Sequence, residues 1–283
     1  MTDILQPTRR VKTGARAPAT IPAMSTAAWD RAGLVPVPVA GRPRPEITAL
    51  RGELPSVDEL FTFMRDAELR FESLRMRIEE HVWNTRGEEL TLIEVALRHP
   101  GEVKVLSSIP AHGTTGSYDV WVSDGSTVQT YVASRKVGTR RPMRPLVRGV
   151  ADAADLPGRS RVYVPVTMLP AESLPDLFLH PAGYSQNVLG TGACAVTGTT
   201  VVAGREAIVL ESDHPRAIEV VADRPDFRVR LAVDRADGVI LRLEESIGGQ
   251  VTRDAIVTSY APNAPLPPSA FSFTFPSDTT FLY

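Results

Sequence analysis

The sequence predicts an α+β protein in which an N-terminal amphipathic helix precedes a long antiparallel sheet. Residues 118–132, YDVWVSDGSTVQTYV, alternate in hydrophobicity on both sides of Asp124-Gly125, a pair that supplies the positive φ angles of a tight hairpin turn. Residues 56–74 instead carry apolar side chains at three-to-four-residue spacing, the period of a helix with one buried face. Strand-like runs separated by turn sequences then fill the final third of the chain.

Composition excludes several classes of function. The chain has 283 residues, of which 43% are hydrophobic and 23% charged, enough for a substantial core. Lys and Arg number 31 against 33 Asp and Glu, so no overall charge excess directs the protein to nucleic acid, and we expect no nucleic-acid partner. Cys194 is the only cysteine and the five histidines are scattered, which excludes an intramolecular disulfide and shows no metal-ligand spacing. We expect no metal and no cofactor.

The first 52 residues predict an extended, proline-rich tail ahead of a domain over residues 53–283. Seven prolines discourage helix and central strand in this stretch. Residues 1–50 lack the apolar core of about 7 to 15 residues that a secretory signal needs, and no run approaches the roughly 18 apolar residues of a transmembrane segment. The location predicted from the sequence as written is the cytoplasm, and it becomes extracytoplasmic if a signal has been removed.

The helix is expected to start at Ser56, because Ser56 and Glu59 have the spacing of a capping box, and to run for about five turns to Leu74. Residues 74–82, 88–98 and 102–109 then alternate as strands, joined by turns at 85–87 and at His99-Pro100-Gly101. With the hairpin they predict a five-stranded antiparallel meander.

After the hairpin, residues 135–148 are expected to form a loop with six basic residues. It is either a solvated loop or a site for an anionic headgroup, with Arg140, Arg141 and Arg144 as candidates. Residues 161–168 are strand-like, and residues 169–181 read as a short interrupted helix able to close over a cavity. The last strands bring the expected total to roughly ten. They are 193–202, 206–212, 227–233, 239–248 and 250–260, and the aromatic-rich C-terminal tail is expected to fold back on the domain.

No local catalytic motif is found. The sequence lacks a phosphate-binding G-x-x-x-x-G-K and a G-x-S-x-G nucleophile elbow, and Cys194 lies among small apolar residues on a predicted strand. The carboxylate pairs Glu79-Glu80 and Glu244-Glu245 each point to opposite faces of a strand, so neither pair can share a proton locally, although carboxylates from distant strands could still meet. The chain is therefore expected not to be an enzyme on its own.

Four segments, in this order, resemble the LolA-like family of lipoprotein carriers, together with the RseB/MucB sensor domain and the mycobacterial LppX/LprG lipoproteins. They are RHPGEVKV (98–105), VWVSDGSTVQTYV (120–132), VVAGREAIVLES (201–212) and LAVDRADGVILRLEES (231–246). The resemblance implies a strongly curved, half-open β-barrel with helices packed in its concave side, which holds an acyl chain or lipid outside the cytoplasm. The family's arginine before proline, which helps to hold the lid closed, corresponds to His99 here, with Arg98 one position earlier, so these two are gate candidates.

The leading hypothesis is non-enzymatic binding of a lipid, acyl chain or apolar metabolite in the half-barrel. The alternatives are a cytosolic biosynthetic protein, or one subunit of an enzyme pair, that holds a small substrate in the pocket, and an RseB-like sensor that binds a protein partner. Leu174, Leu177 and Phe178 are the predicted lid, and strand alternation allows only one of Trp121 and Tyr118 to face the cavity. The predicted lining residues are Leu92, Val103, Val105, Trp121, Tyr131, Phe227, Val229, Leu231, Leu241 and Leu243.

Overall fold

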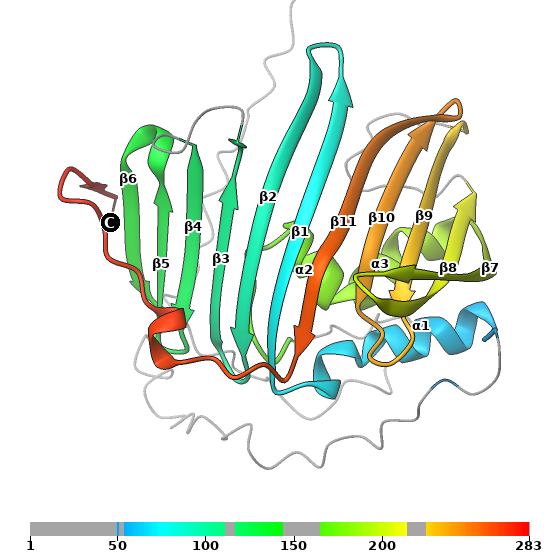
Figure 1. The fold of residues 1–283 in the computed structure, drawn as a ribbon, viewed down its shortest axis with the longest axis horizontal. Helices are drawn as coiled ribbons and strands as arrows, with labels where there is room; N and C mark the ends of the chain where they lie inside the picture. Colours follow the sequence, from blue (N-terminus) through cyan, green and yellow to red (C-terminus); the bar gives the residue numbers. More distant parts are fainter. Residues whose placement is uncertain (1–49, 51–53, 111–116, 144–164, 214–224, 283) are drawn as a thin grey trace, which may run out of the picture. The chain divides into compact units, whose positions relative to one another are not determined.

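The computed structural model describes residues 50, 54–110, 117–143, 165–213 and 225–282. Its main feature is one sheet (Figure 1), and in the described residues the strands number twelve. They are β1 (Ser73–Asn84), β2 (Gly87–Arg98), β3 (Glu102–Ser108), β4 (Tyr118–Asp124), β5 (Thr127–Val132), β6 (Val137–Pro142), β7 (Ala193–Val202), β8 (Arg205–Asp213), β9 (Phe227–Asp234), β10 (Ile240–Ile247), β11 (Gln250–Pro262) and β12 (Thr280–Phe281).

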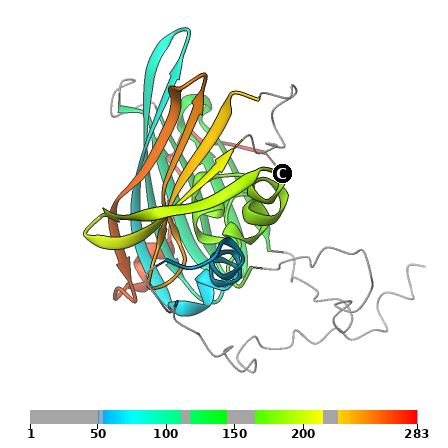
Figure 2. The ribbon, with the colours of Figure 1, turned by 90° about the vertical axis from the view of Figure 1, so that its right-hand side faces the viewer.

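The sheet consists of two meanders joined side by side. The strand order is β12-β6-β5-β4-β3-β2-β1-β11-β10-β9-β8-β7, so β1 to β6 and β7 to β11 each follow chain order. β1 pairs with β11 and unites them, with Met76 opposite Tyr260. Every pairing is antiparallel except that of β12 with β6. The predicted curved, unclosed antiparallel sheet is confirmed, and Figure 2 shows the strands curling round the helices.

Two strands of the sheet, β6 and β12, are not predicted by the sequence. Residues 135–148 were expected to form a loop, but a 3₁₀ turn (Ala133–Arg135) is followed by β6, which pairs with β5 on one side and β12 on the other. Gly138, Arg140 and Arg141 hide the alternation of β6, and one of its two partners, β12, lies far away in the sequence. The expected strand at 161–168 is not seen at residues 165–168, and its first four residues lie outside the described part.

The first helix is shorter than predicted. α1 (Val57–Arg65) begins with the expected capping box, in which Ser56 and Glu59 satisfy each other's backbone N–H groups. It ends at Asp66, and a 3₁₀ helix, η3 (Ala67–Arg70), continues the chain. Arg70 Nη1 donates to the Phe63 carbonyl at 2.7 Å and satisfies an acceptor at the end of α1. The apolar stripe persists across the break because Ala67 and Phe71 are also buried.

The predicted lid helix is two short helices and a 3₁₀ turn: α2 (Leu174–Leu179), α3 (Pro181–Asn187) and η7 (Leu189–Thr191). Ser173 caps α2, and Pro181 starts α3 because proline fits the first turn of a helix but not its interior. Figure 1 shows α2 and α3 behind the sheet. We call this concave, helix-covered side the inner face and the other side the outer face. No helix among the described residues is long and apolar enough to cross a membrane.

The outer face is covered in part by the C-terminal segment (residues 263–282), which includes a 3₁₀ helix, η8 (Pro268–Phe271). Phe273 and Phe275 pack on Tyr131, with ring centroids 5.6 and 6.2 Å away. Gly138 allows this approach, since a Cβ there would lie 2.6 Å from Phe275 Cε1. The expected folding back of the tail is confirmed. At the other end of the chain, Leu50, within the predicted N-terminal tail, packs against the core.

Candidate functional site: the covered inner face

Most of the predicted lining residues meet on the inner face. The strand register brings them together, since Val105 lies opposite Val95 and Trp121. Leu231 likewise lies opposite Leu210 and Leu243 on its two neighbouring strands. All belong to one apolar cluster, in which Trp121 is partly buried and the others are buried. The members predicted from the sequence are Val103, Val105, Trp121, Phe227, Val229, Leu231, Leu241 and Leu243.

Leu92 and Tyr131 lie on the outer face, which corrects their assignment as lining residues. Leu92 alternates with Ile93, which is buried on the inner face, so its side chain points the other way. Tyr131 belongs to the second apolar cluster, with Tyr118, under the C-terminal segment. Trp121, not Tyr118, therefore faces inward. Alternation predicts which residues share a face, but the inward face is decided by what packs on each side.

The lid segment (residues 165–191) covers part of this face. Leu174 and Phe178, two of the predicted lid residues, are buried in the same cluster as the sheet side chains, and Leu177 packs against it. Leu60 and Met64 of α1 are buried in the same cluster. In this arrangement the side chains of the lid segment and α1 themselves occupy the inner face.

A buried ion cluster attaches the lid segment to η3. Glu68 of η3 is 1% exposed, and its carboxylate accepts hydrogen bonds from the Val166 backbone N–H at 2.9 and 3.0 Å. His180 Nε2 lies 3.1 Å from Glu68 Oε2, and His180 Nδ1 lies 2.8 Å from Asp176 Oδ1. Burial by itself would lower the pKa of His180, but the hydrogen bonds and charges of the two carboxylates outweigh it and raise the pKa to about 9. At neutral pH the ring is an imidazolium held between two anions.

The sequence analysis missed this cluster. Glu68 and His180 are 112 positions apart, so no local pattern relates them. The one available signal was Asp176 four residues before His180, a spacing at which two side chains meet on a helix.

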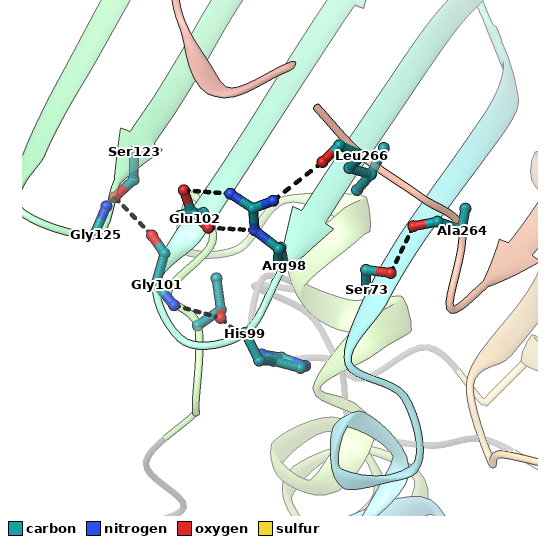
Figure 3. A network of polar contacts seen from close by, with 10 residues as sticks. Ser73, Arg98, His99, Gly101, Glu102, Ser123, Gly125, Ala264 and Leu266 are labelled. Carbon is teal, nitrogen blue, oxygen red and sulfur yellow. Dashed lines mark hydrogen bonds and ion pairs between the residues drawn. The ribbon is translucent and has the colours of Figure 1, made fainter. Parts of the chain in front are cut away.

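A second attachment joins the lid segment to the turn between β2 and β3 (Figure 3). Thr167 Oγ1 lies 2.7 Å from His99 Nδ1 and accepts the Gly101 backbone N–H at 2.8 Å. The His99 ring also stacks on Phe71, with centroids 5.4 Å apart. Of the two gate candidates, His99 is thus the one that reaches the lid.

Arg98 has a different contact. Its guanidinium binds Glu102, with Nη2 to Oε1 at 2.8 Å, and donates to the Leu266 carbonyl at 3.0 Å (Figure 3). It also lies 5.0 Å from the centre of the Phe271 ring. Arg98 therefore fastens the C-terminal segment and does not hold the lid.

The Asp-Gly hairpin turn packs against the neighbouring turn. Buried Ser123 donates its hydroxyl to the Gly101 carbonyl at 2.9 Å and accepts the Gly125 N–H at 3.1 Å. A Cβ on Gly101 would lie 3.1 Å from the Gly125 Cα, and both glycines have positive φ. The Asp124-Gly125 turn is therefore part of the packing at this end of the sheet.

Distant carboxylates do meet on the inner face, around an arginine. Arg253 Nε lies 2.8 Å from Glu80 Oε1, and Arg253 Nη1 lies 3.5 Å from Glu245 Oε1. Burial raises the pKa of nearby Tyr184, and the charge of Glu245 raises it further. The guanidinium separates the two carboxylates and neutralises one of them, so they do not form a proton-sharing pair. This row of charges lies beside the apolar cluster, directly opposite Val82 across β1 and β11.

The remaining candidates are not assembled into a site. Arg140 and Arg141 are exposed neighbours on β6 whose side chains point to opposite faces, and Arg144 lies outside the described residues. Cys194 donates to the Leu189 carbonyl at 3.0 Å and packs against the core, as predicted for a thiol acting as a small hydrophobe. No group of three or more metal-ligating side chains occurs in the part of the chain that the structure describes.

No family model matches the sequence, and no curated protein matches it. Solved structures are similar to it in fold. The complex structure of Pseudomonas aeruginosa MucA/MucB is 17% identical with a TM-score of 0.43, over 77% of this chain and 61% of that chain. Mycobacterium tuberculosis lipoprotein LppX is 10% identical with a TM-score of 0.39, over 74% and 98%. A LolA superfamily protein from Nitrosomonas europaea is 10% identical with a TM-score of 0.31, over 77% and 98%.

MucB, LppX and LolA are also the proteins that the four sequence segments resemble. The likeness is one of fold. This chain spans 61% of the length of the MucB complex chain it matches.

Proposed function

We propose that the inner face binds the apolar part of a lipid, an acyl chain or a similarly apolar metabolite, without converting it. One observation carries the proposal: the apolar side chains of the inner face form one contiguous cluster, yet the segment that covers them is separate from the sheet. The lid segment reaches the turn after β2 and η3 through Thr167 and His180, and none of its described residues pairs with the sheet as a strand. A cover of this kind can move without unpairing any strand.

The energetics suit an apolar chain. Burying one methylene group contributes about 0.8 kcal/mol, so a chain of ten or more carbons compensates for the displaced contacts of Phe178 and Leu179. A place for the chain to enter is available on β5 and β6, next to Trp121. There Val128, Val132 and Val137 are half-buried and belong to neither apolar cluster of the described residues.

The polar groups near the face favour binding over conversion. Glu80 and Glu245 are engaged by Arg253, and the imidazolium of His180 is engaged by Glu68 and Asp176. A general acid or base must instead be free to exchange a proton with its substrate. The alternative of a biosynthetic pocket would take its reactive group from a partner subunit or from outside the described part of the chain.

The test is binding of a fluorescent acyl-chain probe, together with native mass spectrometry of the purified protein. Val132→Lys puts a charge at a half-buried position of the inner face. Val201→Lys is its matched control, because Val201 is 69% exposed on β7. We expect Val132→Lys to weaken probe binding at least tenfold and Val201→Lys to leave it unchanged. Equal binding by both variants, or no binding by the wild type, contradicts the proposal. Turnover of a co-purified metabolite would instead support the biosynthetic alternative.

A protein partner is the second candidate, and the edge strand β7 favours it. β7 is the last strand of the described sheet, and its ten residues carry no charge and no proline, the features that usually protect an edge. An extended, uncharged segment of another protein could pair with this edge as an added strand. Thr199→Pro, at an exposed position of β7, should then abolish capture of that protein. If the variant captures as much of it as the wild type does, β7 is not the binding edge.

The cytoplasmic location was predicted from residues 1–50 alone, which apart from Leu50 lie outside the described part of the chain. It stays a prediction. Fractionation of cells that express the full gene tests it directly, by assigning the protein to the cytoplasm or to an extracytoplasmic fraction.

A further inference from the structure

The edge of the sheet opposite β7 combines exposed cations with exposed apolar side chains. Arg140 and Arg141 are exposed on β6, and Phe281 and Leu282 at the end of the C-terminal segment are 57% and 49% exposed. The parallel pairing of β12 with β6 brings them together. Phe281 lies opposite Gly138, and the Leu282 N–H donates to the Gly138 carbonyl at 2.9 Å.

Each side of this edge carries one cation and one apolar group. Phe281 shares the outer face with Gly138, 4.8 Å from Phe275 between ring centroids, and Arg140 lies two residues along the same face. Leu282 and Arg141 have the opposite parity and point to the inner side. The amphipathic surface is therefore the edge itself, approached end-on.

The charge of this region differs from that of the rest of the protein. Residues 127–143 and 273–282 contain four basic residues (Arg135, Lys136, Arg140 and Arg141) and one acidic residue, Asp278, which pairs with Lys136 at 2.6 Å. The balance of four against one gives a local charge of +3, in a chain with a formal net charge of −2.

Several exposed arginines elsewhere on the sheet are paired with carboxylates on neighbouring strands, as Arg228 is with Asp213 at 2.7 Å and Arg230 with Glu211 at 3.4 Å. Arg75 on β1 is exposed without such a partner among the described residues, but no exposed apolar side chain pairs beside it. Among the described residues, Arg140 and Arg141 have no such carboxylate partner. Their charges are available to an anion.

We propose that this edge docks on the surface of an anionic lipid bilayer, with Arg140 and Arg141 at the phosphate groups and Phe281 and Leu282 at the headgroup–acyl boundary. Exposed Phe and Leu would gain nothing from free phosphate, which interacts with charge alone. A single-stranded nucleic acid would need a row of stacking aromatics, and among the described residues Phe281 is the one exposed ring beside the arginines.

Docking in this orientation has a consequence for the proposed ligand. The edge adjoins β5, whose half-buried Val128 and Val132 were suggested above as the place of entry. A lipid leaving the bilayer would therefore meet the inner face first at β5 and β6. Membrane docking itself does not depend on ligand binding, so either can fail without the other.

The experiment is co-sedimentation of the full chain with sucrose-loaded vesicles of phosphatidylcholine, with and without phosphatidylglycerol. We expect binding to the anionic vesicles that weakens as salt is added, because salt screens the arginines. Arg140→Gln/Arg141→Gln should weaken it roughly 30-fold, the factor expected for two cations at about 1 kcal/mol each. Phe281→Ser/Leu282→Ser should weaken binding that remains at high salt.

Matched controls separate the edge from net charge and general stickiness. Arg228→Gln/Arg230→Gln removes the same charge from another part of the sheet, and Val201→Ser removes another exposed apolar side chain. Both should bind like the wild type, and circular dichroism confirms that every variant is folded. Equal binding to neutral and anionic vesicles, equal loss in the two arginine pairs, or tighter binding to an oligonucleotide than to vesicles overturns the proposal.

Discussion

We expect the imidazolium of His180 to make the attachment of the lid segment sensitive to pH, and its contribution can be measured. The perturbation is the double substitution Glu68→Gln/His180→Gln, which removes the buried ion pair but keeps side chains able to hydrogen-bond. Removing His180 alone would leave the Glu68 carboxylate, 1% exposed, without its cation, so the variant would carry a new penalty of its own.

The size of the effect follows from the pKa of His180, which is raised from 6.5 to about 9. At about 1.4 kcal/mol per pKa unit, this shift corresponds to about 3 kcal/mol of stabilisation. A raised pKa means that the folded state holds the proton more tightly than the unfolded state. The contribution is therefore fully present below pH 6.5 and is lost as the pH rises through 9.

The assay is urea unfolding followed by tryptophan fluorescence at several pH values from 6 to 10. We expect the free energy of unfolding of the wild type to exceed that of the double variant by the largest amount at pH 6. This difference should shrink by about 3 kcal/mol by pH 10. Using the difference cancels other groups that titrate in the same range. His81→Gln/Glu88→Gln is the matched control, since this histidine–carboxylate pair at 2.6 Å lies at the surface and contributes little. A difference that stays constant between pH 6 and 10 would refute the reasoning.

Three further predictions concern other contacts. Gly138→Ala places a Cβ 2.6 Å from Phe275, so it should lower the free energy of unfolding by about 1 to 3 kcal/mol and expose the C-terminal segment to chymotrypsin. Gly183→Ala is the control, because the space around its Cβ position is open, and it should do neither. Equal cleavage of the two variants would contradict the packing argument. Thr167→Val removes the contacts to His99 and Gly101, so it should lower the free energy of unfolding by about 1 to 2 kcal/mol and speed amide exchange in the lid segment. Thr130→Val on β5 should not speed exchange there. Unchanged exchange in Thr167→Val would show that Thr167 is not an attachment. Burial, and then the charge of Asp234, raises the pKa of Asp237 to about 7. Asp237→Asn should therefore become more stable relative to the wild type as the pH rises from 5 to 9. Thermal melting that shows no such trend would contradict this prediction.

The strands were predictable because their signal is local. In residues 118–132, alternation and one Asp-Gly turn specify a hairpin whatever the rest of the chain does. The same local signal cannot say which side is inner. Trp121 and Tyr131 were both assigned to the lining, yet they lie on opposite faces, because the C-terminal segment brings Phe273 and Phe275 to Tyr131 while Trp121 meets the inner cluster.

The lid helix was predicted, but its attachments were not, for the same physical reason. Apolar periodicity around Leu174 and Phe178 shows that a helix buries one side. The partner of His180 is fixed only when η3 and the lid segment are folded against each other. β6 is a second example, since its outer neighbour β12 comes from the other end of the domain, with Phe281 opposite Gly138.

The ion cluster also explains how a cover held mainly by apolar contacts takes up one position. Apolar burial is not directional, so Phe178 and Leu179 alone would tolerate small shifts of the lid over the sheet. Glu68 removes that freedom because one carboxylate binds both the Val166 N–H, before the lid helices, and His180, between them. If the Glu68 carboxylate is removed, both contacts lose their common anchor at once. The lid should therefore be released as a unit and not frayed from one end.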